Sequence, residues 1–132
     1  MATIEVTDQS FHETVKQGIV LLDWWAPWCG PCRAFAPIYE QTAKKHPDIV
    51  FGKVNTEAEG RLAGTFGIRS IPTLMIFRDD ILIFSQPGMV PAAALEDLIR
   101  QTRALDMDEV RRKVAAEEAT EKAAAGESRQ SP

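Results

Sequence analysis

Apolar residues along the chain fall into short runs, and segments with helical spacing lie between them. The run at residues 19–25 is apolar at every position except Asp23, as in a central strand that is covered on both faces. A carboxylate inside such a run needs an explanation. Similar runs predict further strands at residues 3–6, 49–55, 73–77 and 81–84.

Helices are predicted between these strands. Ser10 and Glu13 have the spacing of a capping box, which predicts a helix that runs through Gln17 and is ended by Gly18. Apolar residues at helical spacing predict further helices at residues 29–45, 57–66 and 91–105.

The elements therefore follow the order β-α-β-α-β-α-β-β-α. Helices between the first strands imply parallel pairing, because parallel neighbours need a long crossover. Asp79 and Asp80 predict a tight turn, since aspartate tolerates left-handed backbone geometry, and the last two strands then form an antiparallel hairpin. We expect an α/β fold with a central mixed β-sheet, helices on both of its faces and a C-terminal helical extension.

The extension has a composition of its own. Residues 107–125 are rich in Ala, Glu, Lys and Arg, which favour helix, but they offer only a partial apolar stripe of Met107, Val110 and Val114. This predicts a surface helix that docks weakly, followed by a disordered end from Gly126. A coiled-coil arm is disfavoured because sustained apolar heptads are missing.

The change in composition divides the chain into a predicted domain, residues 1–105, and a charged extension, residues 106–132. The first part carries 12 acidic and 10 basic side chains and the second carries 7 and 5, so each has a net charge of −2. Neither part has the basic excess that phosphate binding favours, which argues against nucleic acid as a partner. The 132 residues suffice for one domain with a single core.

Hydropathy argues against a membrane protein. No run approaches the roughly 18 apolar residues of a membrane span, and the N-terminus lacks the basic and apolar regions of a signal peptide. We expect the protein in the cytoplasm. Thiols are mostly reduced there, so a pair of cysteines is expected to cycle rather than to staple the fold.

The candidate chemistry lies in Cys29 and Cys32, the only two cysteines of the chain. Two thiols with this spacing can close and open a small disulfide ring. A strand-like run leads into the pair and a helical pattern leaves it, which is the setting in which C-x-x-C indicates a redox motif.

A zinc site and inert packing are the two other interpretations of the cysteines. A closed zinc site needs four ligands, and only His12 and His46 remain, far apart and outside any paired motif, so no metal is expected. Inert packing is disfavoured because Gly30 and Pro31, between the cysteines, are poor core residues.

Several stretches resemble the thioredoxin family: residues 22–33, which include Trp28-Cys29-Gly30-Pro31-Cys32, the pair Ala36-Pro37, residues 67–74, and Gly88. The resemblance covers residues 3–105 and implies the thioredoxin fold and the reduction of protein disulfides. The chain departs from the family at Asp79-Asp80, where Asn-Gly is common, and in the extension after residue 105.

Helix position assigns the roles of the cysteines. Cys29 is expected at the N-terminus of its helix, where free N–H groups and the helix dipole favour a thiolate, and Arg33 adds positive charge. Cys29 is therefore the predicted nucleophile, and Cys32, one turn deeper, the resolving thiol. Gly30-Pro31 resembles the dipeptide of the reducing members of the family.

Asp23 is the predicted proton carrier. Its apolar neighbours favour burial, which raises the pKa of a carboxyl and lets it accept and return the proton of Cys32. Lys53, on the next strand, is its predicted charge partner, and the resemblance assigns this role to the pair. A solvated strand-end carboxylate and an ordinary exposed lysine are the alternatives.

The substrate surface is implied by the resemblance. Ile71-Pro72 resembles the family's cis-proline loop, whose backbone would pair with an extended substrate segment. Trp28, Gly88 and Met89 would complete an apolar rim, although a core position for Trp28 is an alternative. The neighbouring tryptophans of the strand, Trp24 and Trp25, are interpreted as packing residues.

No glycine-rich nucleotide-binding motif is present, so no cofactor is expected and electrons must come from another protein. The donor in this family is the flavoprotein thioredoxin reductase, which draws on NADPH. The predicted partners are thus this reductase and protein disulfide substrates, and a monomer is expected. The rival hypothesis is a thioredoxin-fold binding subunit whose groove holds a partner and whose redox turnover is incidental.

Overall fold

The computed structural model describes the backbone of residues 2–130 and the side chains of residues 2–126. Within these residues, five strands form one sheet in the order β1-β3-β2-β4-β5. Their bounds are β1 (Thr3–Glu5), β2 (Ile19–Trp25), β3 (Val50–Asn55), β4 (Thr73–Arg78) and β5 (Ile81–Pro87).

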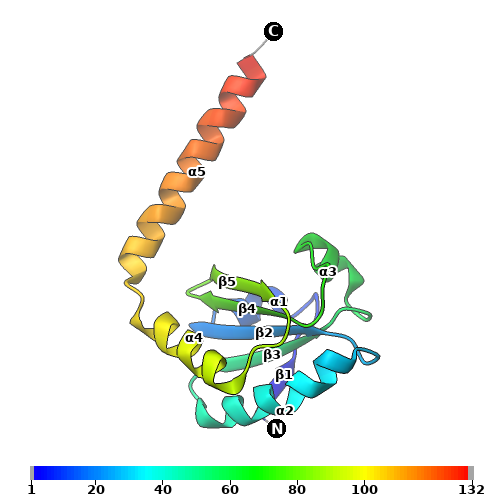
Figure 1. Ribbon diagram of the computed structural model, residues 1–132. Coiled ribbons are helices and arrows are strands. Elements are labelled where there is room, and N and C mark those ends of the chain that lie inside the picture. Colours follow the sequence, from blue (N-terminus) through cyan, green and yellow to red (C-terminus); the bar gives the residue numbers. More distant parts are fainter. Residues whose placement is uncertain (1, 131–132) are drawn as a thin grey trace.

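Five helices complete the described chain: α1 (Phe11–Val15), α2 (Gly30–Lys45), α3 (Gly60–Thr65), α4 (Ala92–Ala104) and α5 (Met107–Gln130). Helices α2 and α4 cover one face of the sheet, and α1 and α3 cover the other (Figure 1). The predicted mixed sheet with helices on both faces is therefore confirmed. Among the described helices, none has the length and apolarity needed to cross a membrane.

Strand β2 lies at the centre of the sheet and carries the candidate carboxylate. It pairs in parallel with β3, which in turn pairs in parallel with β1, and it pairs antiparallel with β4. The β4–β5 hairpin turns at Asp79 and Asp80, whose φ angles are +52° and +69°, as expected for residues that tolerate left-handed geometry. Because its neighbours exclude water, Asp23 on β2 is fully buried.

Local hydrogen bonds correct two helix predictions. The hydroxyl of Ser10 accepts the N–H of Thr7 at 2.9 Å and makes no hydrogen bond to the start of α1, so the predicted capping box does not form. At its other end, α1 stops at Val15 rather than at the predicted residue 17. Likewise α3 begins at Gly60 rather than at residue 57. The side-chain oxygen of Asn55 accepts the N–H groups of Glu57 and Ala58, which holds this segment as a turn.

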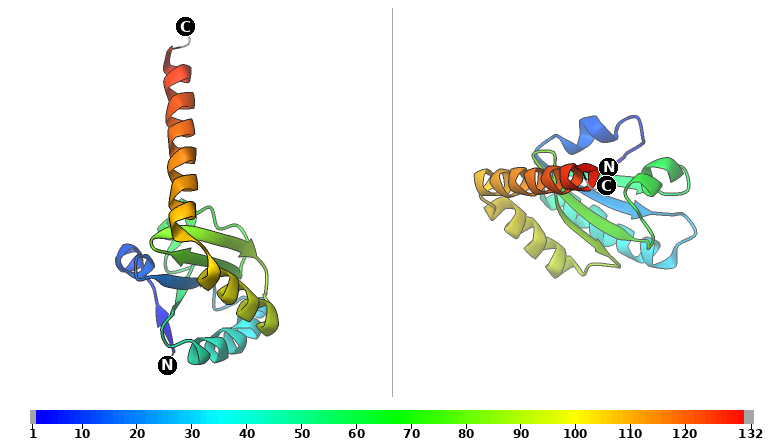
Figure 2. Two further views of the ribbon diagram at one scale, coloured as in Figure 1. Left: turned by 90° about the vertical axis from the view of Figure 1, so that its left-hand side faces the viewer. Right: turned by 90° about the horizontal axis from the view of Figure 1, so that it is seen from above.

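The extension forms a single helix, α5, which projects away from the domain (Figures 1 and 2). Asp106 caps this helix, because its carboxylate accepts the N–H groups of the second and third residues after it. The helix continues through Gln130, so residues 126–130 are helical rather than disordered as predicted. Residues 131–132 lie outside the described part of the chain.

The base of α5 is attached to the domain by specific contacts. The guanidinium of Arg78, at the end of β4, donates to the carbonyl oxygens of Thr102, Arg103 and Leu105, at distances of 2.8 to 3.3 Å. Met107 is buried, whereas the rest of the predicted apolar stripe is only half-buried. The weak docking predicted for this helix is therefore confined to its first turns.

Candidate active site

Cys29 and Cys32 are joined by a disulfide at the start of α2. Cys29 is the N-cap of this helix, in extended geometry, and its Sγ accepts the backbone N–H of Cys32 at 3.2 Å. Pro31, in the first turn, has no N–H to offer, so this cap bond goes to Cys32. The strand-to-helix turn therefore places the first sulfur on the helix N-terminus.

This position favours negative charge on Cys29. The unpaired N–H groups of a helix N-terminus carry partial positive charge, which stabilises a thiolate once the pair is reduced. Both sulfur residues are nearly enclosed, with 5 % of Cys29 and 2 % of Cys32 exposed, and Gly30 and Pro31 between them are exposed. The pair can take up two electrons on opening and lose them on closing.

The loop before β4 lies against the disulfide. The Ile71–Pro72 peptide bond is cis, as the resemblance implied. The carbonyl oxygen of Ile71 is 3.7 Å from the Sγ of Cys29, and the half-buried Ile71 side chain packs on the two cysteines. The loop that carries the cis-proline therefore lies directly beside the sulfur of Cys29.

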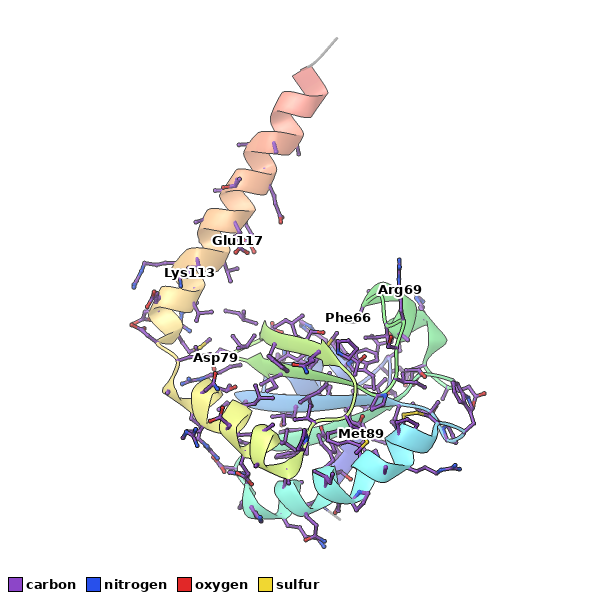
Figure 3. The ribbon with its side chains drawn as sticks, in the orientation of Figure 1. Phe66, Arg69, Asp79, Met89, Lys113 and Glu117 are labelled. Atoms are coloured by element: carbon purple, nitrogen blue, oxygen red, sulfur yellow. A yellow bond between two sulfur atoms is a disulfide. The ribbon has the colours of Figure 1, made fainter. Side chains whose placement is uncertain are left out.

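Three further residues complete the surface around the pair. Trp28 is 65 % exposed, and Met89 is 40 % exposed. Met89 lies on the segment between β5 and α4 (Figure 3). Trp28 is therefore a surface residue, not a core residue. Gly88 has a φ of +97°, which favours glycine, and its N–H donates to the carbonyl of Pro72 at 2.8 Å. Pro72 itself is buried, so its ring adds little to the exposed surface.

Asp23 is not a solvated strand-end carboxylate. The residue is completely buried, and neither carboxylate oxygen has a hydrogen-bond partner within the described residues. Burial raises the pKa of Asp23 to about 7, and the nearby charge of Lys53 opposes this shift. A carboxyl with this pKa can both accept and release a proton near neutral pH.

Lys53 lies opposite Asp23 in the register of β2 and β3. Its ammonium nevertheless forms no ion pair with Asp23 in the described structure, and lies instead over the ring of Trp25, 4.7 Å from the centroid. The sequence interpretation of Lys53 as a charge partner thus describes an influence through space rather than a direct contact.

Two residues of the site have roles that the sequence analysis missed. Trp25, interpreted as packing, contacts the cluster of the two cysteines and also holds the Lys53 ammonium. Tyr39, one of the apolar positions of the predicted helix, donates its hydroxyl to the carbonyl of Gly52 at 2.7 Å, and burial together with the charge of Asp23 raises its pKa. The sequence did contain a signal for Trp25: side chains alternate between the two faces of a strand, so Trp25 lies on the same face of β2 as Asp23.

The two histidines that a zinc site would have needed lie away from the cysteines. The Nε2 of His46 is 2.7 Å from a carboxylate oxygen of Glu96, which ties the end of α2 to α4, and His12 lies on α1. In the described part of the chain, no group of three or more His, Cys, Asp or Glu side chains could hold a metal ion.

Comparison with known proteins adds a family context. The family model described as Thioredoxin matches residues 2–101. A Streptomyces coelicolor protein named "Putative thioredoxin 2" is 56 % identical over 119 residues, which cover 89 % of each chain. Thioredoxin from Bacillus subtilis is 37 % identical over 102 residues, which cover 76 % of this chain and 98 % of that protein.

Solved structures are similar in fold. A mutant thioredoxin from Halobacterium salinarum superposes with a TM-score of 0.73 at 29 % identity, covering 79 % of this chain and 94 % of its own. Thioredoxin from Malassezia sympodialis superposes with a TM-score of 0.69 at 27 % identity, covering 77 % of this chain and 91 % of its own.

Proposed function

The chain belongs to the thioredoxin family and is a thiol-disulfide oxidoreductase that reduces protein disulfides, and within that activity we propose that Cys29 is the nucleophile, Cys32 the resolving thiol and Asp23 the proton carrier. The observation that carries the proposal is the N-cap position of Cys29, whose Sγ receives the N–H of Cys32. Only one of the two sulfurs occupies this anion-stabilising position.

The proposed reaction has two exchange steps. The thiolate of Cys29 attacks one sulfur of the substrate disulfide, which forms a mixed disulfide and releases the first substrate thiolate. Cys32 then gives its proton to Asp23, and the new thiolate attacks the Sγ of Cys29. This attack releases the second substrate thiolate and re-forms the Cys29–Cys32 disulfide, so two electrons have passed to the substrate.

The environment of Asp23 supports its part in the second step. With a pKa of about 7, the carboxyl is about half ionised at neutral pH, so it can accept the proton and later return it. Lys53 completes the proposed machinery, because its charge keeps this pKa from rising further. A solvated carboxylate would be a weaker base, since its pKa would lie near 4.

We assign substrate binding to the surface beside Cys29. The backbone of Ile71, held by the cis bond to Pro72, offers an edge for an extended segment, as in strand addition, and Gly88 allows the substrate backbone to approach. Trp28 and Met89 supply apolar contact, because both are exposed large side chains. Gly30 and Pro31, between the two cysteines, are exposed, so no large side chain covers the start of α2 beside the sulfurs.

Electrons for the next cycle come from another protein. A reductase partner follows from the family in general; we propose specifically the flavoprotein thioredoxin reductase, which draws on NADPH. The proposed place is the cytoplasm, where reducing donors keep such a pair cycling. We further propose that the protein acts as a monomer and that catalysis is complete within residues 1–105, with residues 106–132 as an extension.

The test is insulin reduction with dithiothreitol as the electron source. Wild-type protein should accelerate insulin precipitation, and Cys29→Ser should abolish the acceleration while circular dichroism shows an unchanged fold. Thr120→Ser, on the exposed face of α5, serves as a matched control and should behave as wild type. Equal rates for Cys29→Ser and wild type would overturn the assignment of the nucleophile.

A further inference from the structure

The face of the sheet beneath α2 carries a row of unlike side chains. Asp23 and Trp25 point to this face of β2 because residues two apart along a strand share a face. Lys53 on β3 is in register with Asp23 and therefore diagonal to Trp25. A lysine stem is long enough to carry its ammonium toward either neighbour.

The ammonium takes the diagonal position. It lies 4.7 Å from the centroid of the Trp25 ring, within cation–π distance, while both oxygens of Asp23 have no hydrogen-bond partner among the described residues. The indole is itself held in place, since Trp25 is half-buried and packs on the cluster formed by Ala26 and the two cysteines.

Other charged groups around Lys53 do not explain this position. Glu5 on β1 is in register with Lys53 on its other side but forms no ion pair with it in the described structure. Glu40 on α2 is already bonded, because its carboxylate accepts the N–H of Ala2 at 2.9 Å and the hydroxyl of Thr3 at 2.8 Å. Lys44 lines an open pocket together with Glu40 and Lys53, and its positive charge repels an ammonium rather than attracting it.

The groups around Asp23 leave Lys53 as its one nearby cation among the described residues. On β4 the residue in register with Asp23 is the apolar Leu74. From α2, Tyr39 faces the carboxyl with a hydroxyl that is bonded to Gly52, and the cysteine pair at the start of the helix adds thiols once it is reduced. The distance between the Lys53 ammonium and the Asp23 carboxyl therefore determines how far a neighbouring positive charge lowers the pKa of Asp23.

We propose that Trp25 is a positioning residue: its indole face holds the Lys53 ammonium short of an ion pair with Asp23, so that the buried carboxyl keeps the ability to take up and return a proton. This inference rests on the proposed role of Asp23. A direct ion pair would lower the pKa of the carboxyl and make it a weaker base. Complete removal of the ammonium would raise this pKa and favour the neutral form.

The test is a titration of the Asp23 carboxyl carbon by ¹³C NMR in the oxidised protein. Trp25→Leu frees the ammonium to approach Asp23, so the midpoint should fall by about half a pH unit, the shift that corresponds to a typical exposed cation–π contact. Trp25→Phe keeps an aromatic face and should stay within about 0.2 units of wild type.

The lysine provides the decisive control. In a Lys53→Met background, Trp25→Leu should leave the midpoint unchanged, because no ammonium remains to be released. The same fall in that background, or no fall in Trp25→Leu alone, would overturn the proposal, since Trp25 would then act through packing.

A second measurement needs no variant. The Lys53 methylene protons next to the ammonium should show an upfield ring-current shift from Trp25 in the wild-type protein, and a random-coil value would overturn the proposal even if Trp25→Leu did not fold. The positioning role of Trp25 and the catalytic role of Asp23 can also be tested separately. If the titration midpoint in Trp25→Leu falls as expected but the pH profile of mixed-disulfide release does not move with it, then Trp25 positions Lys53, and Asp23 is not the catalytic base.

Discussion

The Sγ of Cys29 lies 3.7 Å from the carbonyl oxygen of Ile71, although 42 residues separate them in the chain. The first residue belongs to the N-terminus of α2 and the second to the loop before β4. Their contact places the sulfur that we propose as the nucleophile beside the backbone of Ile71, where we propose that an extended peptide disulfide binds. In this proposal, the exchange reaction and substrate binding take place at one point of the surface.

The division of labour between the cysteines can be tested by trapping. Cys32→Ser should accumulate mixed disulfides between Cys29 and substrates, because the resolving thiol is missing, whereas Cys29→Ser should trap none. Mass spectrometry of the captured adducts measures both. Equal trapping by the two variants would contradict the order of attack.

The stability of the oxidised protein should depend on pH through Asp23. Its pKa is about 7 in the folded chain against 3.8 for the ordinary group, so the unfolded chain loses this proton first as the pH rises. The folded state then binds more protons, and the free energy of unfolding falls between about pH 4 and pH 7 by an amount on the order of 4 kcal/mol. Below about pH 4 the carboxyl is protonated in both the folded and the unfolded chain, so its ionisation no longer affects the free energy of unfolding.

The substitution Asp23→Asn measures how much the ionisation of Asp23 contributes to the free energy of unfolding, since asparagine resembles the protonated carboxyl in shape. The variant should be more stable than wild type at pH 8, by up to about 4 kcal/mol, and equal to it near pH 3.5. Urea unfolding at both values of pH measures the difference. An equal gain at both would mean that ionisation of Asp23 is not its cause.

The same variant should slow the release of the mixed disulfide. Without the carboxylate, Cys32 lacks a base, so the rate at pH 7 should fall by about tenfold or more and approach that of wild type above about pH 9, where the thiol ionises unaided. Stopped-flow fluorescence from pH 5 to pH 10 follows this step. A profile that the substitution does not change would exclude the proton-carrier role.

Gly52 should not tolerate a side chain. A Cβ at this position would lie 2.7 Å from a methyl of Val6 and 2.8 Å from a methyl of Leu22, both buried, so Gly52→Ala should cost about 1–3 kcal/mol of unfolding free energy. Gly64→Ala, on α3 with no atom within 4 Å of the new Cβ, should instead stabilise by about 0.5–1 kcal/mol. Urea unfolding measures both variants, and a change in unfolding free energy of the same sign for Gly52→Ala and Gly64→Ala would contradict this packing.

Truncation after Leu105 should separate stability from chemistry. It removes the buried Met107 and the ion pair between Arg111 and Asp79 at 3.5 Å, so unfolding free energy should fall by about 1–3 kcal/mol, mostly from the methionine. Turnover of a small disulfide should stay within a few-fold of the full chain. Met107→Ala in the full chain should reproduce most of the loss in stability.

Two substrates of different size make this test sharper. If α5 contacts large partners, the truncation should change the rate with insulin but not with a small aromatic disulfide. A still-folded truncation that had lost activity toward the small disulfide would show that residues 1–105 are not sufficient for catalysis.

The sequence by itself determined the features that depend on neighbours along the chain. The spacing of Cys29 and Cys32, the apolar run around Asp23 and the turn at Asp79-Asp80 each act within a few residues, and the structure contains the strand, helix start and hairpin that they predict. Resemblance added the cis bond before Pro72, which no local preference favours.

Tertiary structure decided which distant groups meet. Local spacing matched a capping box at Ser10, but its hydroxyl bonds Thr7 instead. Charge alone paired Lys53 with Asp23, whereas the ammonium rests on Trp25, because register and packing offer an aromatic face at the diagonal position. Sequence patterns report the preferences of single segments; the position of a side chain between competing partners depends on how the segments pack against one another.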